Sequence, residues 1–435
     1  MAANLFQTFR NLLRTHFGNF HTLLEKLPDP RVKHLITYQM RTICMHAVLM
    51  FLFKIGANRS FRFLGRDGYG SENFAKICQD FHIQSIPHHD TVRNVFVRLP
   101  FEEVEKVGVE MCRSLLRNKT LCQFRLLDSH YLLAIDGTQQ VTFKKRHCLK
   151  CLKTKRNDGT IFYHHNILEA KIVCRNGFAI PIATEFIENP GLNYDKQDCE
   201  TKAAYRLLKR VKQYFPQLRI CLLADALYVN QNIIDICEDS NWKFIITFKE
   251  GSAKSLWSDY IDFKNIKYCS HTERKIYNKE NYITQNEKYF WKNNLEYHGH
   301  ALSVFELDIE NATNQKRFMF MSNYYATDEN ILDLINKGGR QRWKIENCFN
   351  EEKNGGYHLE HLYSENENAM KVYVYFLQIA HVLNSIMELG IITKKVIQKR
   401  YGSIKNVTEI IFAHFRYKIL SLDVDDAVNV IFSSA

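Results

Sequence analysis

The segment that decides the fold spans residues 338–353 and reads GGRQRWKIENCFNEEK. It predicts a helix, because no proline interrupts it and two glycines follow it as a stop signal. At about 100° per residue, Arg342, Glu346 and Lys353 share one face of this helix. A carboxylate is a hard oxygen ligand that suits magnesium, and the two flanking bases suit phosphate oxygens. A solvated face with ordinary ion pairs explains the same stripe, so the segment alone leaves both interpretations open.

The composition is that of a folded, basic protein. The 435 residues are enough for two or three domains, and 46% of them are hydrophobic, which excludes a disordered chain. The formal charge of +12 and the pI of about 9.0 predict a polyanionic partner, most simply nucleic acid. The cysteines lie largely among apolar neighbours, as reduced thiols do in the cytosol. The longest apolar run, Ile43–Phe53, is too short to span a bilayer, so no membrane partner is expected.

Residues 1–125 are predicted to be mostly helical. Within them, Ser71–Asp80 and Asp90–Leu99 are two predicted helices, and an aspartate begins the second one as its N-cap. The pair resembles a helix-turn-helix unit. Arg93 and Asn94 would then lie on an exposed face, where such side chains contact phosphates or base edges. A plain helical hairpin with a polar face is an equal alternative to this helical N-terminal DNA-binding region.

The next part of the chain contains short apolar runs that end in acids. Tyr131–Ile135 predicts a buried strand that delivers Asp136 and is followed by a glycine turn. Ile220–Ala224 predicts a second strand that delivers Asp225. Because further strands and helices alternate around these runs, residues 126–251 are expected to form a mixed α/β sheet. For either aspartate alone, a helix cap or a turn is the simpler interpretation.

Residues 252–325 predict a β-rich insertion within the α/β domain, because they are rich in Tyr, Asn, Lys and Thr and contain alternating strand-like pieces. Trp291 in this insertion is a candidate for stacking on a flipped base, although packing in the core is the stronger interpretation. Residues 326–435 are expected to complete the catalytic domain and to add C-terminal helices, of which Met370–Leu389 and Asn406–Leu420 are apolar.

The acids Asp136, Asp225 and Glu346 lie far apart in the chain, so only a fold can bring them together. Three carboxylates that hold two Mg²⁺ ions would activate a nucleophile and stabilise the leaving oxygen in phosphodiester chemistry. If the fold brings them together, the three acids form a candidate metal site for chemistry on nucleic acid.

Several motifs around these acids resemble one family. The sequence is similar to the DDE transposases of bacterial insertion sequences, in the branch with a Tyr-Arg-Glu-Lys signature on the last catalytic helix. Arg342, Glu346 and Lys353 fall at the spacing of that signature, whereas Gly339 stands where the branch has its tyrosine. The other stretches that resemble the family are AIDGT at 134–138, KQDCE at 196–200, ADALY at 224–228 and GYHLEH at 356–361.

The resemblance implies an RNase H-like catalytic core with a β-rich insertion between the second aspartate and the glutamate. It implies a bacterial, cytoplasmic, nucleoid-associated homodimer that cuts double-stranded transposon ends and joins them to target DNA. Two Mg²⁺ ions, for which Mn²⁺ can substitute, would be held by the three acids, and the phosphates by the basic residues of the last helix, namely Arg340, Arg342, Lys344 and Lys353. The rivals are an inert domesticated DNA-binding protein, a metal-dependent nuclease without strand transfer, and an RNA-processing enzyme of the same fold.

Two other features have simpler interpretations. Cys148 and Cys151, with His147 before them and histidines 164 and 165 after them, could bind Zn²⁺, but a closed zinc site needs four ligands and only one CxxC is present. A tight turn with reduced thiols is the favoured interpretation. Trp343 points off the acidic stripe and is expected to pack in the core.

Overall fold

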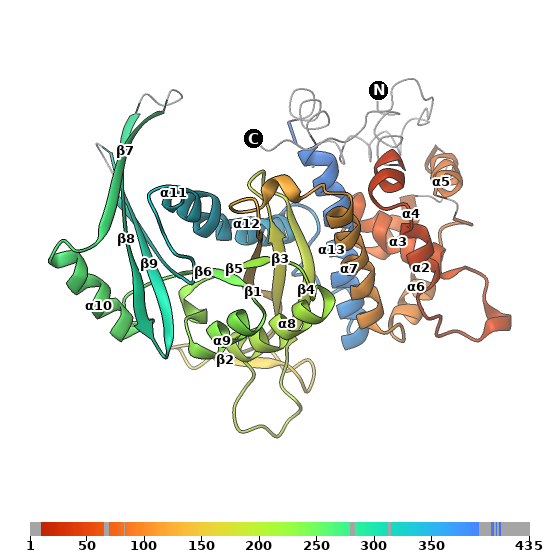
Figure 1. Cartoon of the computed structure of the whole chain (residues 1–435). Coiled ribbons are helices and arrows are strands. Elements are labelled where there is room, and N and C mark those ends of the chain that lie inside the picture. Colours follow the sequence, from red (N-terminus) through yellow and green to blue (C-terminus); the bar gives the residue numbers. More distant parts are fainter. Residues whose placement is uncertain are drawn as a thin grey trace.

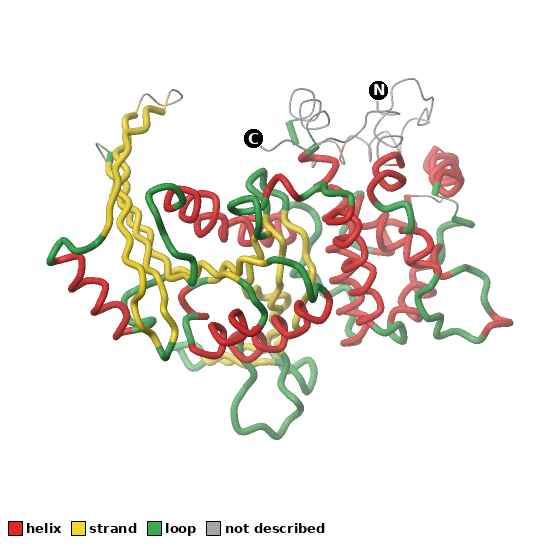
Figure 2. The backbone as a smooth tube through the Cα atoms, viewed as in Figure 1, coloured by secondary structure: helices red, strands yellow, loops and turns green. Residues whose placement is uncertain are grey.

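The computed structural model of the chain describes residues 10–64, 69–81, 83–278, 283–311 and 315–390, with the single positions 402, 403, 406 and 409. A group of N-terminal helices packs beside a mixed sheet and its covering helices, and the sheet continues into a long antiparallel arm (Figure 1 and Figure 2). The predicted helix Asn406–Leu420 falls almost entirely outside the described residues.

The N-terminal helices are organised around α3 (Met40–Leu52), in which every residue except Arg41 is buried. This burial confirms that the long apolar run is a central helix of the fold. The surrounding elements are α2 (Phe20–Glu25), η1 (Lys33–Leu35), α4 (Asn58–Leu64), α5 (Tyr69–Asp80), α6 (His89–Phe96), α7 (Phe101–Arg117) and η2 (Cys122–Phe124).

The two helices of the predicted helix-turn-helix pair are present as α5 and α6. The predicted aspartate cap is wrong, because the N-cap of α6 is His88, whose Nδ1 accepts a hydrogen bond from the backbone N–H of Asp90 at 3.2 Å. Arg93 and Asn94 are exposed on α6, as a DNA-reading face requires. Their contact with DNA stays a prediction.

The core sheet has the RNase H-like order β4-β3-β1-β5-β6. Three long strands pair in antiparallel fashion, and two short strands then continue the sheet in parallel. All five residues of β5 are buried, as expected for an apolar strand covered on both faces. The elements are β1 (Tyr131–Phe143), β2 (Leu152–Lys155), β3 (Ile161–Val173), β4 (Ala179–Ile187), α8 (Glu200–Tyr214), β5 (Ile220–Ala224), η3 (Ala226–Tyr228), α9 (Gln231–Asp239) and β6 (Lys243–Thr247).

The region of the predicted insertion is rich in β-strands, and it extends the core sheet. Its last strand pairs with β6 in antiparallel fashion, so the sheet runs without a break from the core into the arm (Figure 1). The domain boundaries at residues 126, 252 and 326 stay predictions. The elements are α10 (Lys254–Asn265), β7 (Ser270–Asn278), β8 (Ile283–Tyr297), β9 (His300–Glu310) and β10 (Gln315–Ser322).

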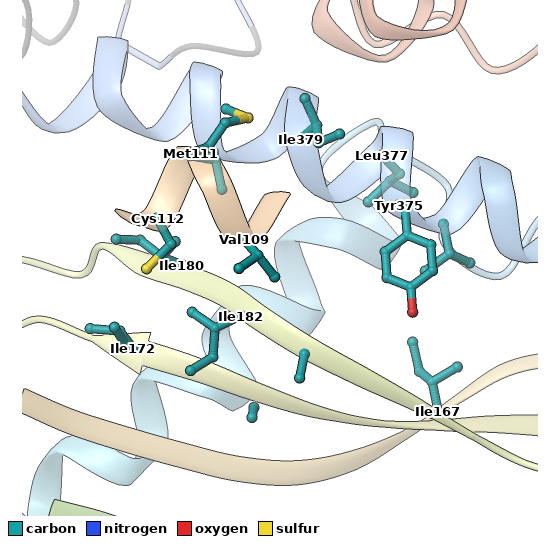
Figure 3. Close-up of a cluster of buried hydrophobic side chains, with 14 of the residues drawn as sticks. Val109, Met111, Cys112, Ile167, Ile172, Ile180, Ile182, Tyr375, Leu377 and Ile379 are labelled. Atoms are coloured by element: carbon teal, nitrogen blue, oxygen red, sulfur yellow. The ribbon is translucent and has the colours of Figure 1, made fainter. Parts of the chain in front are cut away.

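Two apolar clusters hold the helices on the sheet. Side chains of β1 alternate between them, with Leu133 and Ile135 in one cluster and Leu132 and Ala134 in the other. Helix α8 packs in the first cluster, and α12 (Trp343–Asn354) packs in the second. Helices α7 and α13 (Glu367–Leu389) bury aliphatic and aromatic side chains against β3 and β4, as Figure 3 shows.

Helix α13 confirms the predicted apolar helix Met370–Leu389. Among the described residues it is the one helix that is long and apolar enough to cross a membrane. However, 89% of its most apolar 18-residue stretch is buried inside the fold, where the helix packs against α3 and α7. Its hydrophobicity is therefore accounted for by the core.

Two predicted element boundaries are wrong. Strand β1 does not end in a glycine turn after Asp136, because it continues to Phe143 and stays paired with β3 along its length. The predicted helix 338–353 is also not one helix. It follows the short α11 (Ile331–Asp333) as a π-helical turn η4 (Leu334–Gly338), a 3₁₀ turn η5 (Gly339–Arg342) and then α12, which ends before Gly355 as the stop signal predicts.

Candidate active site

Asp136 and Asp225 are brought together by two neighbouring parallel strands. β1 pairs with β5 so that Tyr131 lies opposite Ile220 and Ala134 opposite Leu223. The same offset, continued along the two strands, places Asp136 level with Asp225. Since neighbouring strands lie about 4.8 Å apart, the two acids occupy adjacent positions at one edge of the core.

Glu346 reaches the same place from α12, which packs on the face of the sheet that Ala134 shares with Asp136. Arg342 connects the two acids. Its guanidinium lies 2.6 Å from Oε1 of Glu346 and 3.9 Å from Oδ2 of Asp136. The predicted stripe of Arg342 and Glu346 is therefore a real face, and it is turned toward the first aspartate.

The environment of Asp136 disfavours its charged form. Burial raises the pKa of Asp136 to about 6. The carboxylates of Glu346 and Glu200 also raise this pKa, whereas the guanidinium of Arg342 lowers it. Several carboxylates lie close together here, and the single guanidinium neutralises only part of their negative charge. The site is thus suited to receiving cations.

Asp225 is oriented differently from the other two acids. Its Oδ1 accepts a hydrogen bond from the backbone N–H of Leu227 at 2.6 Å, and Oδ2 lies 4.0 Å from the ammonium of Lys249. The aspartate therefore caps η3, which is the simpler role considered from sequence. Within the described part of the chain, the compact groups of candidate metal ligands lie elsewhere, so the three acids face one region without forming a closed ligand cluster.

Glu200 is a fourth carboxylate at this site that the sequence reasoning did not assign. It comes from the first turn of α8, and its side chain occupies the space that a Cβ at Gly137 would need. Tyr228 donates a hydrogen bond to it at 3.3 Å. Burial raises the pKa of Glu200, and the nearby charge of Asp225 raises it further. The signal was present in the sequence, because Glu200 ends the motif KQDCE at 196–200.

A groove opens beside Asp225, between β6–β10 and the start of α12. Arg340, Arg342 and Lys344 line it, as does Trp343. The prediction that Trp343 packs in the core is wrong, because 61% of its side chain is exposed. The other basic residues of the groove are Lys249, Lys316 and Arg317.

Trp291 does not reach this groove. It lies on β8 opposite Phe305 and is only 3% exposed, within the apolar cluster under α12. No ring face is left for a base, so the stacking candidate is wrong and the favoured interpretation, core packing, is confirmed.

Two residues of the expected signature have local explanations. The ammonium of Lys353 lies 2.8 Å from Oε1 of Glu360, so this lysine is held in an ion pair at the far end of α12. At Gly339, an added Cβ would overlap the ring of Phe320 on β10. A side chain at this position, such as the tyrosine of the family branch, would therefore have to displace the Phe320 ring.

The opposite side of α12 is fixed by buried charges, which we call the inner network: Glu169, Lys171, Cys348, Glu352 and His381. The ammonium of Lys171 lies 2.8 Å from Glu169, 2.7 Å from Glu352 and 3.0 Å from the Cys348 sulfur. Nδ1 of His381 lies 2.9 Å from Glu352. The network joins β3, α12 and α13, so it sets the position of the helix that carries Glu346.

The sheet order, together with acids on β1, after β5 and on the facing helix, is typical of RNase H-like enzymes of the transposase and nuclease type. The family model described as "Transposase DDE domain" matches residues 129–383, which is more than half of the chain and includes all three acids. The chain belongs to this family, and the resemblance seen in its sequence is confirmed at that level. The comparison with curated proteins gave no match.

Proposed function

We propose that the protein is the transposase of a bacterial insertion sequence, which cuts the ends of its element and joins them to target DNA. Membership of the transposase family supports DNA as the substrate. The observation that carries the proposal is the bridge by Arg342 between Asp136 and Glu346 on an RNase H-like sheet. Cytoplasmic, nucleoid-associated action as a homodimer that pairs two ends belongs to the same proposal.

The donor set fits Mg²⁺, with Mn²⁺ as a substitute. Asp136, Asp225 and Glu346 offer only carboxylate oxygens, the donors that these hard cations prefer, and the raised pKa of Asp136 indicates a deficit of positive charge. Two such ions, when bound there, would supply Lewis-acid activation of the attacking and leaving oxygens. Asp225 would have to turn from its capping position toward the other two acids.

The protein's own side chains would bind and orient the DNA. Arg342 would leave Glu346 and donate to a phosphate at the cut, because a guanidinium binds carboxylate and phosphate oxygens with the same fork geometry. Arg340 and Lys344 would follow the backbone along the groove. Trp343 takes over the stacking role first considered for Trp291, since its exposed ring lines the groove. Lys353 would contact DNA only after release from Glu360.

The test uses the full-length protein, Mg²⁺, a labelled DNA that carries the ends of the element, and a supercoiled target. Inverted repeats that flank the gene define the end sequence. The wild-type protein should nick the ends and join them to the target. Glu346→Gln should lower cleavage by about a thousandfold, since a metal ion contributes several kcal/mol of transition-state stabilisation. The exposed Glu365→Gln is the matched control and should cleave as the wild type does.

Each rival function corresponds to a different result of this assay. Full activity in Glu346→Gln would show that the catalytic assignment is wrong. Cleavage without joining would indicate a nuclease, and end binding without cleavage would indicate an inert DNA-binding protein. Preferential cleavage of RNA would indicate an RNA-processing enzyme.

A further inference from the structure

A second group of metal-ligating side chains lies outside the acidic site, at the connection between β1 and β2. Cys148 and Cys151 come from that connection, and His165 comes from β3. Their sulfur atoms lie 3.5 Å apart, and each lies 3.3 Å from Nε2 of His165. Cys151 and His165 are buried. The sequence offers these residues as zinc ligands but favours a turn with reduced thiols. The pairing of β2 with β3 adds the proximity, because it brings the histidine to the two cysteines.

The spacing of these three atoms matches a tetrahedral zinc site. With Zn–S bonds of about 2.3 Å and Zn–N bonds of about 2.0–2.1 Å, neighbouring ligand atoms lie about 3.5–3.8 Å apart. The three observed separations fall within a few tenths of an ångström of those values. A small shift of the side chains would therefore admit the ion.

His147 is the candidate for the fourth ligand. One ligand atom from each of His147, Cys148 and His165 lies within 4.8 Å of the others. Nδ1 of His147 is buried without a hydrogen-bond partner among the described residues, while the ring stacks on Phe143. His164, which neighbours the group in sequence, is already engaged by hydrogen bonds with Thr154 and Asn166.

The turn that presents the two cysteines is held in place from outside. The backbone N–H of Cys148 donates to the sulfur of Cys151 at 3.4 Å, which closes the turn. Asn189 donates from its backbone to the carbonyl of Lys150 at 3.0 Å and from its side chain to the carbonyl of Cys151 at 2.9 Å. Such outer contacts fix ligand geometry before a metal binds.

We propose that His147, Cys148, Cys151 and His165 form a structural Zn²⁺ site. Four protein ligands leave no open position, as in structural rather than catalytic zinc sites. The ion would fasten the β1–β2 connection to β3, at an edge of the sheet whose central strand carries Asp136. Residues 144–156, which span the connection, β2 and the residue after it, contain seven Lys and Arg residues and no acid. Zinc would therefore also fix a cationic edge, and its use on DNA rests on the proposed function.

The experiment measures metal content and spectra on the full-length protein. Protein produced with added zinc and passed over a desalting column should carry one zinc ion per chain. Replacement of zinc by Co²⁺ should give the intense near-ultraviolet charge-transfer band of cobalt–thiolate bonds, which the carboxylates of the acidic site do not produce. Cys148→Ser and Cys151→Ser should lose the zinc and most of that band. His147→Ala should keep a weaker site with water in the fourth position.

The controls separate this site from the acidic one. Cys199→Ser, at an exposed cysteine outside the group, and His164→Gln, beside it, should both keep one zinc ion. Glu346→Gln should also keep its zinc ion. A failed cleavage assay would therefore count against the proposed function, and a failed zinc assay against the zinc site. If the cysteine variants do not fold, removal of zinc from the wild type with a chelator should lower its Tm, and re-addition should restore it. A zinc-free protein with an unchanged Tm, or a Cys148–Cys151 disulfide in the purified protein, would overturn the proposal.

Discussion

The two faces of α12 carry similar ionisable residues in opposite environments. On the outer face, Glu346 is 41% exposed and meets one guanidinium that it shares with a second carboxylate. On the inner face, the side chains of Lys171 and Glu352 are fully buried. There the ammonium contacts two carboxylates, and a histidine contacts one of them. The outer face has more carboxylate charge than its one guanidinium can neutralise. On the inner face, the carboxylates are paired with cationic side chains of the protein itself.

This difference indicates that the outer face binds ligands and that the inner face stabilises the fold. Buried charges that lose a partner destabilise a fold strongly, whereas exposed pairs contribute little. The inner face therefore holds the helix in position. On the outer face, the proposed function has the carboxylates exchange Arg342 for metal cations, and has Arg342 exchange the carboxylates for a DNA phosphate. If this division is right, substitutions on the inner face should change stability, and those on the outer face should change activity.

The largest effect on stability is expected for Lys171→Met. The change leaves Glu169 and Glu352 without their common cation, and a broken buried pair costs about 3–5 kcal/mol. Urea unfolding should show this loss of unfolding free energy. Lys106→Met is the control, because it breaks an exposed pair with Glu103 and should cost less than about 1 kcal/mol. Equal losses in the two variants would remove the distinction between the faces.

Glu352→Gln should produce a smaller loss that depends on pH. Burial alone would raise the pKa of Glu352, but the Lys171 ammonium and the hydrogen bond with His381 outweigh it and lower the pKa. At neutral pH the amide should cost about 2–3 kcal/mol, as for a lost charged hydrogen bond. An acid with a lowered folded-state pKa stabilises the fold above its unfolded-state pKa, and this contribution disappears as the pH falls through the folded value.

The difference in unfolding free energy between wild type and Glu352→Gln should therefore shrink as the pH falls below about 4.3, the ordinary pKa of glutamate. Chemical denaturation at a series of pH values from 7 to 3 measures it. A constant difference over that range would contradict the assignment of a lowered pKa to Glu352.

The sequence predicts the parts of this site that local patterns encode. The apolar runs before Asp136 and Asp225 indicate strands, and the spacing of Arg342 and Glu346 indicates a shared helix face; the structure has all of these. Lys171 could not be found in this way. It lies within an apolar strand, and its partners Cys348, Glu352 and His381 come from helices far along the chain.

The errors have a common physical cause, which is tertiary packing that overrides a local signal. A glycine after Asp136 suggests a turn, yet Gly137 is needed because the side chain of Glu200 fills the space of its Cβ. Trp343 was expected in the core, yet it is exposed at the groove, whereas Trp291 packs in the core as the favoured interpretation had it. Gly339, where the family signature has a tyrosine, packs against the ring of Phe320, a contact that the spacing of the signature does not predict.

The smallest effect on the fold, and the clearest test of the outer face, is expected for Arg342→Ala. Its partners Asp136 and Glu346 stay partly exposed, so the unfolding free energy should change by less than about 1 kcal/mol. Affinity for the DNA ends should fall about tenfold, and the slope of log affinity against log salt should drop by about one, as for one lost phosphate contact. Arg342→Lys keeps the positive charge but loses the two-pronged guanidinium geometry, so its DNA affinity should lie between those of the wild type and Arg342→Ala.

Arg342→Ala, which should weaken DNA binding, should not weaken metal binding. The guanidinium occupies carboxylate oxygens that a metal would use, so Mn²⁺ should bind Arg342→Ala at least as tightly as it binds the wild type. Calorimetric titration of Mn²⁺ measures this, with the exposed Arg219→Ala as the control for a lost positive charge elsewhere. Weaker Mn²⁺ binding together with unchanged DNA affinity would mean that Arg342 only supports Glu346. A simultaneous loss of DNA affinity and gain of metal affinity is specific to a residue that exchanges one partner for the other.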